Sequence, residues 1–342
     1  MLIRWPEQID VTLFARACSI DSFDTWADRV SRVRVTKGYK RLFQRELPKF
    51  DVLWCPFFFL DPPQPVIPAA VMIPDLQHER FPEFFDRKTL CKRYHKIRQT
   101  VCHAQRVLTI SEYSKRHLME SYHLPESQVV VTPLDAGADF RLPADARRVE
   151  EVRRKYHLPG QFGFFPANAW PHKNHRTLFR ALARYRDQWG NPPRIVLAGV
   201  KDLGASNLAQ EIEACGLQDT VVHLGFVDKA DMPYLYDAAS FLVFVTLFEG
   251  FGIPVLEAMR RGTPVIASNT TSIPEIAADC AELVDPEDEK AIAAAIHKLL
   301  AHPQEAQRYA AQGRNRAEQF SYDIAAEQTL RAFEAMAAEG MG

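Results

Sequence analysis

The chain has 342 residues, of which 47% are hydrophobic and 25% are charged, and its formal net charge at pH 7 is -1. This length predicts two domains of ordinary globular composition, and the near-neutral charge gives no global field that would attract nucleic acid. The 6 cysteines form no Cys-x-x-Cys pair and no apolar run reaches the length of a membrane-spanning helix, so the sequence indicates no zinc site, disulfide framework or membrane span. A reducing cytoplasm is the simplest setting for such a chain.

Strands and helices alternate through the first half of the sequence, which predicts a parallel α/β domain. The predicted strands span residues 11–15, 51–54, 66–73, 106–110 and 128–132, and the predicted helices span residues 83–105 and 112–122. Ligands of such sheets collect beyond the carboxyl ends of the strands. Asp75, His78 and Ser111 follow predicted strands and are therefore candidate site residues, although each residue type is also common in turns and helix caps.

The stretch 87–106 is rich in basic residues and contains no acidic residue. Its apolar residues Leu90, Tyr94, Ile97 and Val101 recur at helical spacing, which predicts a basic amphipathic helix. Two interpretations stay open. The basic residues either form a solvated face over a core stripe or contact anionic lipid headgroups. Such a contact is worth about 1 kcal/mol per basic residue near the lipid surface.

The start of the sequence contains no Gly-rich phosphate loop, because Gly38 is the only glycine before Gly137. A parallel α/β domain of this kind usually begins with a strand, a Gly-rich turn and a helix. We therefore expect a truncated first domain that lacks its first strand and Gly-rich loop. Such a domain would expose a sheet edge and would be the less stable of the two.

The alternation is more regular in the second half, where six strands predict a doubly wound sheet. The predicted strands span residues 162–165, 194–198, 221–224, 241–245, 264–267 and 281–284. Asn168 and Lys173 follow the first of these strands, Gly199 follows the second and Gly225 the third. These residues would line one edge of the sheet, where Lys173 and the N–H groups of the helix that it begins could together hold a phosphate.

The segment EGFGIPVLEAMR at residues 249–260 connects an apolar strand to a helix and holds the main candidate site residues of this half. Its two glycines allow a sharp turn after an apolar strand, and Pro254 suits the first position of a helix. No side-chain oxygen precedes Pro254 to cap that helix, so its free N–H groups suit an anion. Helical side chains lean toward the N-terminus, so Glu249 and Glu257 can point into one crevice.

These motifs resemble glycosyltransferase family 4, the retaining enzymes of GT-B fold. The matching segments are FEGFGIPVLEAM at 248–259, GTPVIAS at 262–268, PE at 274–275, LVDP at 283–286, PANAWPHKNH at 166–175 and PDLQHERFPEFF at 74–85. The resemblance covers roughly residues 50 to 335, and a Glu-x7-Glu motif with these flanks is highly specific.

The resemblance implies an α/β protein of GT-B fold, with two Rossmann-like doubly wound domains that face each other across a cleft. Residues 1–150 would form the acceptor-side domain, residues 151–318 the nucleotide-sugar-binding domain, and residues 319–342 a helix that crosses back to the first domain. The implied reaction is the transfer of a sugar from a UDP- or GDP-sugar to a glycan or glycolipid acceptor, with retained anomeric configuration. No metal and no further cofactor is implied, and the implied location is cytoplasmic, with peripheral contact to an anionic membrane through the basic helix.

By the family pattern, Glu249 contacts hydroxyls of the donor sugar and Glu257 holds the ribose hydroxyls. Lys173 and the amides of residues 251–253 would stabilise the departing diphosphate, while residues 225–227 would border the base. The candidate catalytic residues are Glu249, Lys173, Asp75 and His78, and the candidate nucleotide-binding residues are Glu257, Gly250, Phe251, Gly252, Ile253, Asn168, Gly199, Gly225, Phe226, Val227 and Ser111.

The sequence departs from the family pattern at three places. Asn168 stands where many members have an arginine, Pro74 where many have a histidine, and Val245-Thr246 where Pro-Ser is usual. The first departure leaves Lys173 as the main cation at the phosphates. Two other functions stay open: a nucleotide-sugar-binding protein without turnover, because of the truncated first domain, and a non-hydrolysing sugar-nucleotide epimerase, against which the Glu-x7-Glu context argues.

Overall fold

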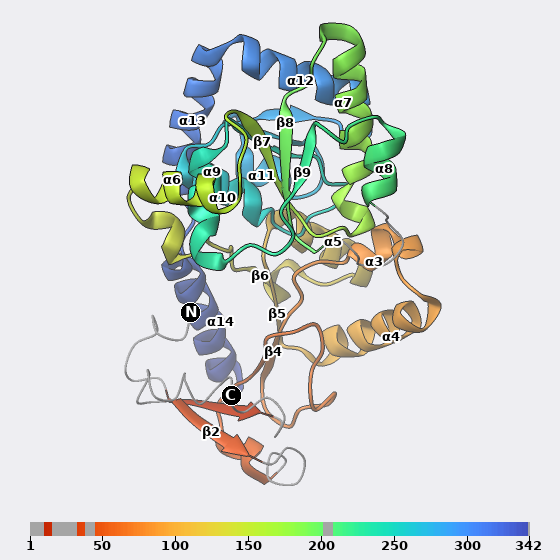
Figure 1. The fold of residues 1–342 in the computed structure, drawn as a ribbon. Helices are drawn as coiled ribbons and strands as arrows, with labels where there is room; N and C mark the ends of the chain where they lie inside the picture. The colour runs from red at the N-terminus through yellow and green to blue at the C-terminus, as the bar shows by residue number, and fades with distance from the viewer. Residues whose placement is uncertain (1–9, 16–32, 38–44, 201–207, 341–342) are drawn as a thin grey trace. The chain divides into compact units, whose positions relative to one another are not determined.

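The computed structural model describes residues 10–15, 33–37, 45–200 and 208–340 (Figure 1). The chain forms two compact units. The first unit combines Met1–Pro133 with Tyr322–Gly342, and the second unit is Leu134–Ser321. The expected lack of a Gly-rich loop falls largely on residues 16–32 and 38–44, which lie outside the described residues.

The first unit contains a four-stranded parallel sheet with the strand order β3-β4-β5-β6. Its strands are β3 (Leu53–Cys55), β4 (Ala69–Met72), β5 (Arg106–Thr109) and β6 (Val129–Val131). A separate parallel pair consists of β1 (Val11–Ala15) and β2 (Val33–Lys37). The sequence predicted β1 with these bounds but not β2, because five residues of alternating polarity are a weak strand signal.

The helices of the first unit are α3 (Gln77–Arg80), η4 (Pro82–Phe84), α4 (Arg87–His103), α5 (Glu112–Tyr122) and α14 (Tyr322–Gly340), with short 3-10 turns η3 (Leu47–Lys49) and η5 (Glu126–Gln128). Of these, α4 and α5 lie close to the predicted helices 83–105 and 112–122. The predicted helix 83–105 is divided because Asp86 caps α4, and its Oδ1 accepts a hydrogen bond of 2.9 Å from the Thr89 N–H.

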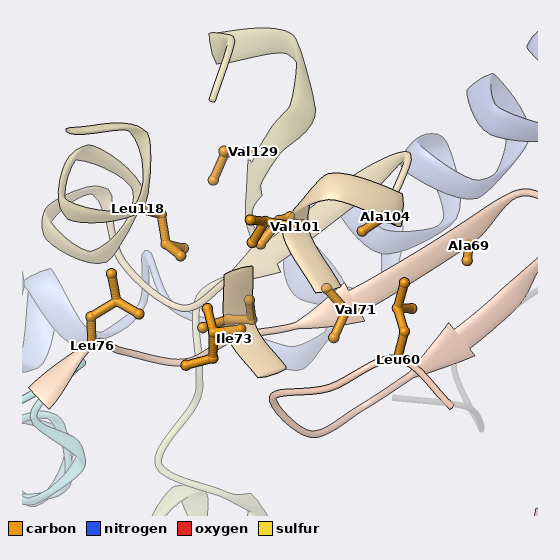
Figure 2. Packing of buried hydrophobic residues seen from close by; sticks show 11 residues of the cluster. Leu60, Ala69, Val71, Ile73, Leu76, Val101, Ala104, Leu118 and Val129 are labelled. Carbon is orange, nitrogen blue, oxygen red and sulfur yellow. The ribbon is translucent and has the colours of Figure 1, made fainter. Parts of the chain in front are cut away.

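Aliphatic side chains from β4, β5, α4 and α5 form the core of the first unit. Figure 2 shows nine labelled members of this cluster, Leu60, Ala69, Val71, Ile73, Leu76, Val101, Ala104, Leu118 and Val129. All four residues of β4 are buried, as expected for a parallel strand that is covered on both faces. This core fixes the end of β4, from which the segment with Asp75 and His78 continues.

The second unit contains a six-stranded parallel sheet with the order β12-β11-β10-β7-β8-β9. Its strands are β7 (Phe162–Pro166), β8 (Arg194–Ala198), β9 (Val221–His223), β10 (Phe241–Phe244), β11 (Val265–Ser268) and β12 (Glu282–Val284). From β7 the chain first moves outward to β8 and β9, and then returns to place β10 on the other side of β7. The order therefore reverses between β7 and β10, which is the point at which doubly wound sheets bind their ligands.

Helices cover both faces of this sheet. They are α6 (Ala146–Lys155), α7 (His175–Trp189), α8 (Leu208–Ala214), α9 (Met232–Ala238), α10 (Ile253–Arg261), α11 (Ile273–Ala277), α12 (Glu289–Ala301) and α13 (Pro303–Ala317), with the 3-10 turns η6 (Ala138–Arg141), η7 (Pro171–Lys173) and η8 (Lys229–Asp231). Figure 1 shows α6, α9 and α10 on one side and α7 and α8 on the other. Strands β7, β10 and β11 are therefore buried on both faces.

Candidate functional site

The loops that follow β7 and β10 bring Lys173 and Glu249 together. The Lys173 Nζ donates a hydrogen bond of 2.7 Å to the Glu249 Oε1, and the two side chains are 18% and 12% exposed. The Lys173 Nζ also lies 5.5 Å from the ring centroid of Phe244, at the end of β10. A partly exposed cation and carboxylate thus meet where the strand order reverses, and both can reach a ligand.

Asn174 links the loop that contains Lys173 to the end of β10 through hydrogen bonds. The Asn174 side-chain amide donates to the carbonyls of Val245 at 2.8 Å and Pro286 at 2.7 Å. The backbone carbonyl of His172 in the same loop accepts from the Leu247 N–H at 2.8 Å. The sequence analysis did not single out Asn174. An Asn directly before a helix is a signal for such a role, because Asn tolerates the left-handed conformation that it adopts here, with a φ of 63°.

Thr271 and Ser272 support the segment with Glu249 from the β11–α11 loop. The Thr271 Oγ1 accepts from the Glu249 N–H at 3.2 Å. The fully buried Ser272 Oγ lies 3.0 Å from the Glu249 carbonyl oxygen and 2.9 Å from that of Phe251, and its single proton is shared between these two acceptors. Thr271 has a φ of 57°, which is strained for a β-branched residue and is typical of positions that the surrounding structure holds in place. Neither residue is among the site residues that the sequence predicted.

The N-terminus of α10 lies at the end of the same segment. Gly252 precedes the helix with a φ of 106°, and no side chain caps its first N–H groups. The left-handed backbone favours glycine here, and a Cβ at Gly252 would come within 2.5 Å of the Ile273 Cδ1, so that side chain would also have to move. An uncapped N-terminus of a nine-residue helix is suited to an anion.

Glu257 lies one turn into α10 and is held by a buried tyrosine. The Tyr236 hydroxyl donates a hydrogen bond of 2.6 Å to the Glu257 Oε2. Burial raises the pKa of Glu257 to about 7, although the bond from Tyr236 and the charge of Lys229 act in the opposite direction. The ionisation of Glu257 therefore falls in the physiological pH range.

Gly199 and Gly225 hold the loops after β8 and β9 together. The Gly199 N–H donates to the Gly225 carbonyl at 2.8 Å. A Cβ at Gly199 would lie 2.5 Å from the carbonyl oxygen of Ala167, so only glycine allows these backbones to approach so closely. At Gly225, in contrast, a Cβ would meet no atom within 4 Å, which leaves open space on that side of the loop.

The other candidates at this edge differ in exposure. Phe226 is 80% exposed, whereas Val227 is buried. The Asn168 Oδ1 accepts from the Val200 N–H at 2.8 Å, so Asn168 connects the loop after β7 to the loop after β8. The segments after the first three strands of the sheet are thus bonded to one another.

Two histidines flank Lys173 and do not add positive charge. Burial lowers the pKa of His172 to about 3 and that of His175 to about 4, and the charge of Lys173 contributes to both shifts. Both imidazoles are therefore neutral at physiological pH, and Lys173 carries the positive charge of this loop.

Two of the three candidates of the first unit, Asp75 and Ser111, make local hydrogen bonds. The Asp75 Oδ1 accepts from the Gln77 N–H at 3.0 Å. The Ser111 Oγ accepts from the Ser114 N–H at 3.1 Å and so caps α5. These contacts engage the Asp75 Oδ1 and the Ser111 Oγ within their own loops.

His78 differs from these two residues because its ring has no polar partner among the described residues. The side chain is fully buried, and its ring lies 5.1 Å from that of Tyr94 and 6.4 Å from that of Phe85. Burial lowers the pKa of His78 to about 4. His78 is therefore a buried neutral imidazole with unused hydrogen-bonding capacity.

Within the described part of the chain, no three His, Cys, Asp or Glu side chains are grouped so that they could hold a metal ion. No helix among residues 45–200 and 208–340 is long and apolar enough to cross a membrane.

Comparison with known families and sequences finds relatives for both halves of the chain. Residues 150–316 match the family model described as Glycosyl transferases group 1. O-antigen chain mannosyltransferase B of Escherichia coli is 29% identical over 279 residues, which are 81% of this chain and 72% of that protein. Serotype-specific mannosyltransferase WbdA of Escherichia coli is also 29% identical, over 200 residues that cover 58% of this chain and only 24% of that protein.

Comparison with solved structures finds the same architecture at low sequence identity. The crystal structure of a glycosyltransferase from Rickettsia africae ESF-5 has a TM-score of 0.74 at 14% identity, and the match covers 97% of this chain and 99% of that chain. The crystal structure of Anabaena Alr3699/HepE in complex with UDP has a TM-score of 0.71 at 19% identity, with coverages of 95% and 91%. These likenesses confirm the predicted fold class.

Proposed function

The chain belongs to the Glycosyl transferases group 1 family and has the GT-B fold, and from this premise we propose that it transfers a hexose, with mannose favoured, from a nucleotide diphosphate-sugar to a glycan or glycolipid acceptor. The choice of mannose and of a surface polysaccharide as acceptor is supported by the relatives, which are named as an O-antigen chain mannosyltransferase and a serotype-specific mannosyltransferase. Retention of the anomeric configuration is part of the proposal.

The observation that carries the proposal is the meeting of Lys173 and Glu249 beside the uncapped start of α10. When the bond between the sugar and the diphosphate breaks, negative charge develops on the diphosphate. The Lys173 ammonium and the amides of Phe251, Gly252 and Ile253 would stabilise that charge. Glu249 would accept hydrogen bonds from the sugar hydroxyls, and its pairing with Lys173 fixes both groups before the donor arrives.

The remaining candidates of the second unit would hold the nucleotide. We propose that Glu257 accepts from the ribose hydroxyls and that the base lies along residues 225–227, where Gly199 keeps the neighbouring loop close. Asn168 bonds Val200 through its oxygen, so its amide N–H groups remain to donate to a phosphate. Since a cation and a helix N-terminus already provide positive potential, we propose that the diphosphate is bound without a metal ion.

In the first unit, we propose that Asp75 and His78 contact the sugar or the acceptor. Ser111 would contribute to substrate binding through the start of α5, which it caps. His78 would act as a neutral hydrogen-bonding group, because its pKa is about 4. Its variant His78→Phe keeps an aromatic ring beside Tyr94 and Phe85 and removes the ring nitrogens. Slower transfer with unchanged nucleotide affinity would support the assignment.

The function is tested with a panel of UDP-, GDP- and ADP-sugars that includes GDP-mannose. Binding is measured by calorimetry, and transfer and donor hydrolysis are followed by release of the nucleotide diphosphate, with and without EDTA. We expect one donor to bind and to turn over equally in both conditions. Donor binding without any turnover would support a nucleotide-sugar-binding protein instead, and loss of binding in EDTA with recovery in manganese would contradict metal-free binding.

The basic helix α4 supports a proposed contact between the first unit and an anionic membrane. Arg87, Lys88 and Lys92 are exposed, and Phe57, which precedes Phe58 in the chain, is 75% exposed. Arg93, farther along α4, lies over the rings of Phe58 at 5.1 Å and Phe85 at 4.9 Å. Exposed cations attract anionic headgroups, and exposed aromatic rings are typical of groups that insert at the interface.

Co-sedimentation with vesicles that contain anionic lipid tests this contact. The double variant Lys88→Glu/Lys92→Glu should lose binding, whereas Lys290→Glu on the exposed face of α12 serves as the matched control. Equal binding by both variants would contradict the contact.

A further inference from the structure

The buried hydroxyl of Tyr236 has a single hydrogen-bond partner among the described side chains, and this partner is Glu257. Tyr236 lies on α9 and is fully buried, with its ring 5.0 Å from that of Phe164 and 5.7 Å from that of Phe140, both in edge-on contact. A buried tyrosine hydroxyl requires a polar partner. Here the partner is a carboxylate that the proposed function assigns to the nucleotide.

We infer that Tyr236 is a positioning residue, whose hydroxyl holds the Glu257 Oε2 so that the Oε1 is presented to the ribose hydroxyls of the donor. This inference rests on the proposed role of Glu257 in nucleotide binding. The geometry supports it, because the bond to the Oε2 is 2.6 Å and the Oε1 makes no hydrogen bond with the described residues. One oxygen thus fixes the rotamer of the side chain, and the other stays available.

The other charged groups near α10 have partners of their own. Arg261 pairs with Asp237 of α9, and Arg260 pairs with Asp135 and Glu318. On the neighbouring elements, Arg141 of η6 pairs with Asp135, while Arg314 and Arg316 of α13 donate to the carbonyls of Arg261, Glu275 and Ile276. Among the described residues, Tyr236 and Lys229 lower the pKa of Glu257 against the effect of burial, and Tyr236 has the larger effect of the two.

The bond from Tyr236 also influences the charge of Glu257. Burial raises the pKa of this carboxyl to about 7, and the hydroxyl opposes the shift because it stabilises the ionised form. Loss of the hydroxyl would raise the pKa further, so a larger fraction of Glu257 would be protonated at neutral pH. A protonated carboxyl is a weaker acceptor for ribose hydroxyls.

The variant Tyr236→Phe tests the inference, because it removes the hydroxyl and keeps the ring between Phe140 and Phe164. We measure the affinity for UDP and GDP by calorimetry between pH 6 and pH 9, and the pKa of Glu257 in the ligand-free protein by NMR of its carboxyl carbon. The expected results are binding about 10-fold weaker at pH 7.5, a midpoint of the affinity curve at higher pH, and a raised pKa of Glu257. Unchanged kcat at saturating donor would place the effect in binding.

Two further proteins separate positioning from a merely structural role. In the background Glu257→Gln, the addition of Tyr236→Phe should cost no further affinity, whereas a structural role predicts the same loss in both backgrounds. Site-specific replacement of Tyr236 by 3-fluorotyrosine retains the fold and strengthens the donor, so the midpoint should move to lower pH. This arm tests the inference even when Tyr236→Phe fails to fold.

The outcomes distinguish the two levels of the argument. When the wild-type protein binds UDP or GDP but neither tyrosine replacement moves the affinity midpoint or the pKa of Glu257, the positioning role is overturned and the proposed function stands. When the wild-type protein binds neither nucleotide, nor any sugar conjugate of either, both fall.

Discussion

The two parallel sheets use the carboxyl ends of their strands differently. In the second unit the strand order reverses between β7 and β10, and the loops after these strands join through the pair Lys173–Glu249. In the first unit the four strands β3 to β6 follow one another in chain order without a reversal, and Asp75 and Ser111 bond within their own loops. Polar residues at strand ends are thus equally visible in both halves of the sequence, but the topology decides whether they converge.

The two units also differ in the charge of their candidate residues. The second unit holds Lys173, Glu249 and Glu257 in partly buried positions next to an uncapped helix. The candidate residue of the first unit with unused hydrogen-bonding capacity is His78, which burial keeps neutral. We therefore expect nucleotide affinity to depend on the second unit, and variants of the first unit to affect stability or transfer.

Among the variants of the second unit's site, Lys173→Ala should cause the largest loss of transfer rate. Loss of one donor to a developing anion costs about 10²–10³ in rate, and two neutral histidines cannot replace the ammonium. The measurement is the transfer rate at saturating donor, with thermal unfolding as a check on folding. Lys290→Ala, an exposed lysine of α12, is the matched control and should leave the rate unchanged. Full activity in a folded Lys173→Ala protein would remove the phosphate role.

The variant Glu257→Gln should weaken binding of the nucleotide diphosphate by about 1.5–3 kcal/mol, the range for a hydrogen bond to a charged group. Glu249→Gln is the internal control, because it should spare nucleotide diphosphate affinity and reduce transfer. Calorimetry with UDP and GDP on both variants measures the difference. Equal losses would mean that the two roles are assigned wrongly.

The same Glu257→Gln variant should gain stability at alkaline pH. The pKa of Glu257 in the folded protein is about 7, above the ordinary value of 4.5, so between these pH values the folded state retains a proton that the unfolded state has lost. Stability due to this group is therefore highest below about pH 4.5, falls as the pH rises to about 7 and stays low above it. Thermal unfolding should show the variant more stable than wild type at pH 8, with the difference vanishing at pH 4.5.

Much of the fold could be predicted from the sequence, because apolar runs and their spacing mark buried strands directly. The bounds of α5 and of β8 are those predicted, and the six strands of the second sheet occur where the pattern placed them. The pair Lys173–Glu249 could also be anticipated, since each residue follows one of the two strands at the reversal. What remained hidden was the bonding between loops.

The supporting residues show why that bonding was hidden. Asn174, Thr271 and Ser272 act through bonds to backbone groups of segments distant in the sequence, and Tyr236 reaches Glu257 from another helix. Nothing in their local sequence specifies these partners, which depend on how the loops meet in three dimensions. Ser111, in contrast, was recognisable as a cap, because its partner Ser114 is only three residues away.

The variant Ser272→Ala should have a smaller effect than the loss of a charged group. It frees the carbonyls of Glu249 and Phe251 and loosens the segment that carries Glu249 and the amides before α10. We expect a loss of about 10-fold in transfer, because an unsatisfied buried group costs about 1–3 kcal/mol. Hydrogen exchange of residues 247–256 should rise, and Ser272→Thr should restore both values. Unchanged exchange and activity would contradict the supporting role.

The smallest effect is expected for Ser111→Ala, and it tests the comparison from the side of the first unit. Loss of an N-cap costs about 1 kcal/mol of stability, because the N–H of Ser114 loses its acceptor. Ser111→Asp, which can also cap a helix, should retain most of that stability, and neither variant should alter calorimetric affinity for UDP or GDP. The opposite pattern, unchanged stability with weaker nucleotide binding, would give Ser111 a direct role in the nucleotide site. The contrast between the two sheets would then not hold at the end of β5. The start of α5 would bind the nucleotide even though Ser111 caps the helix.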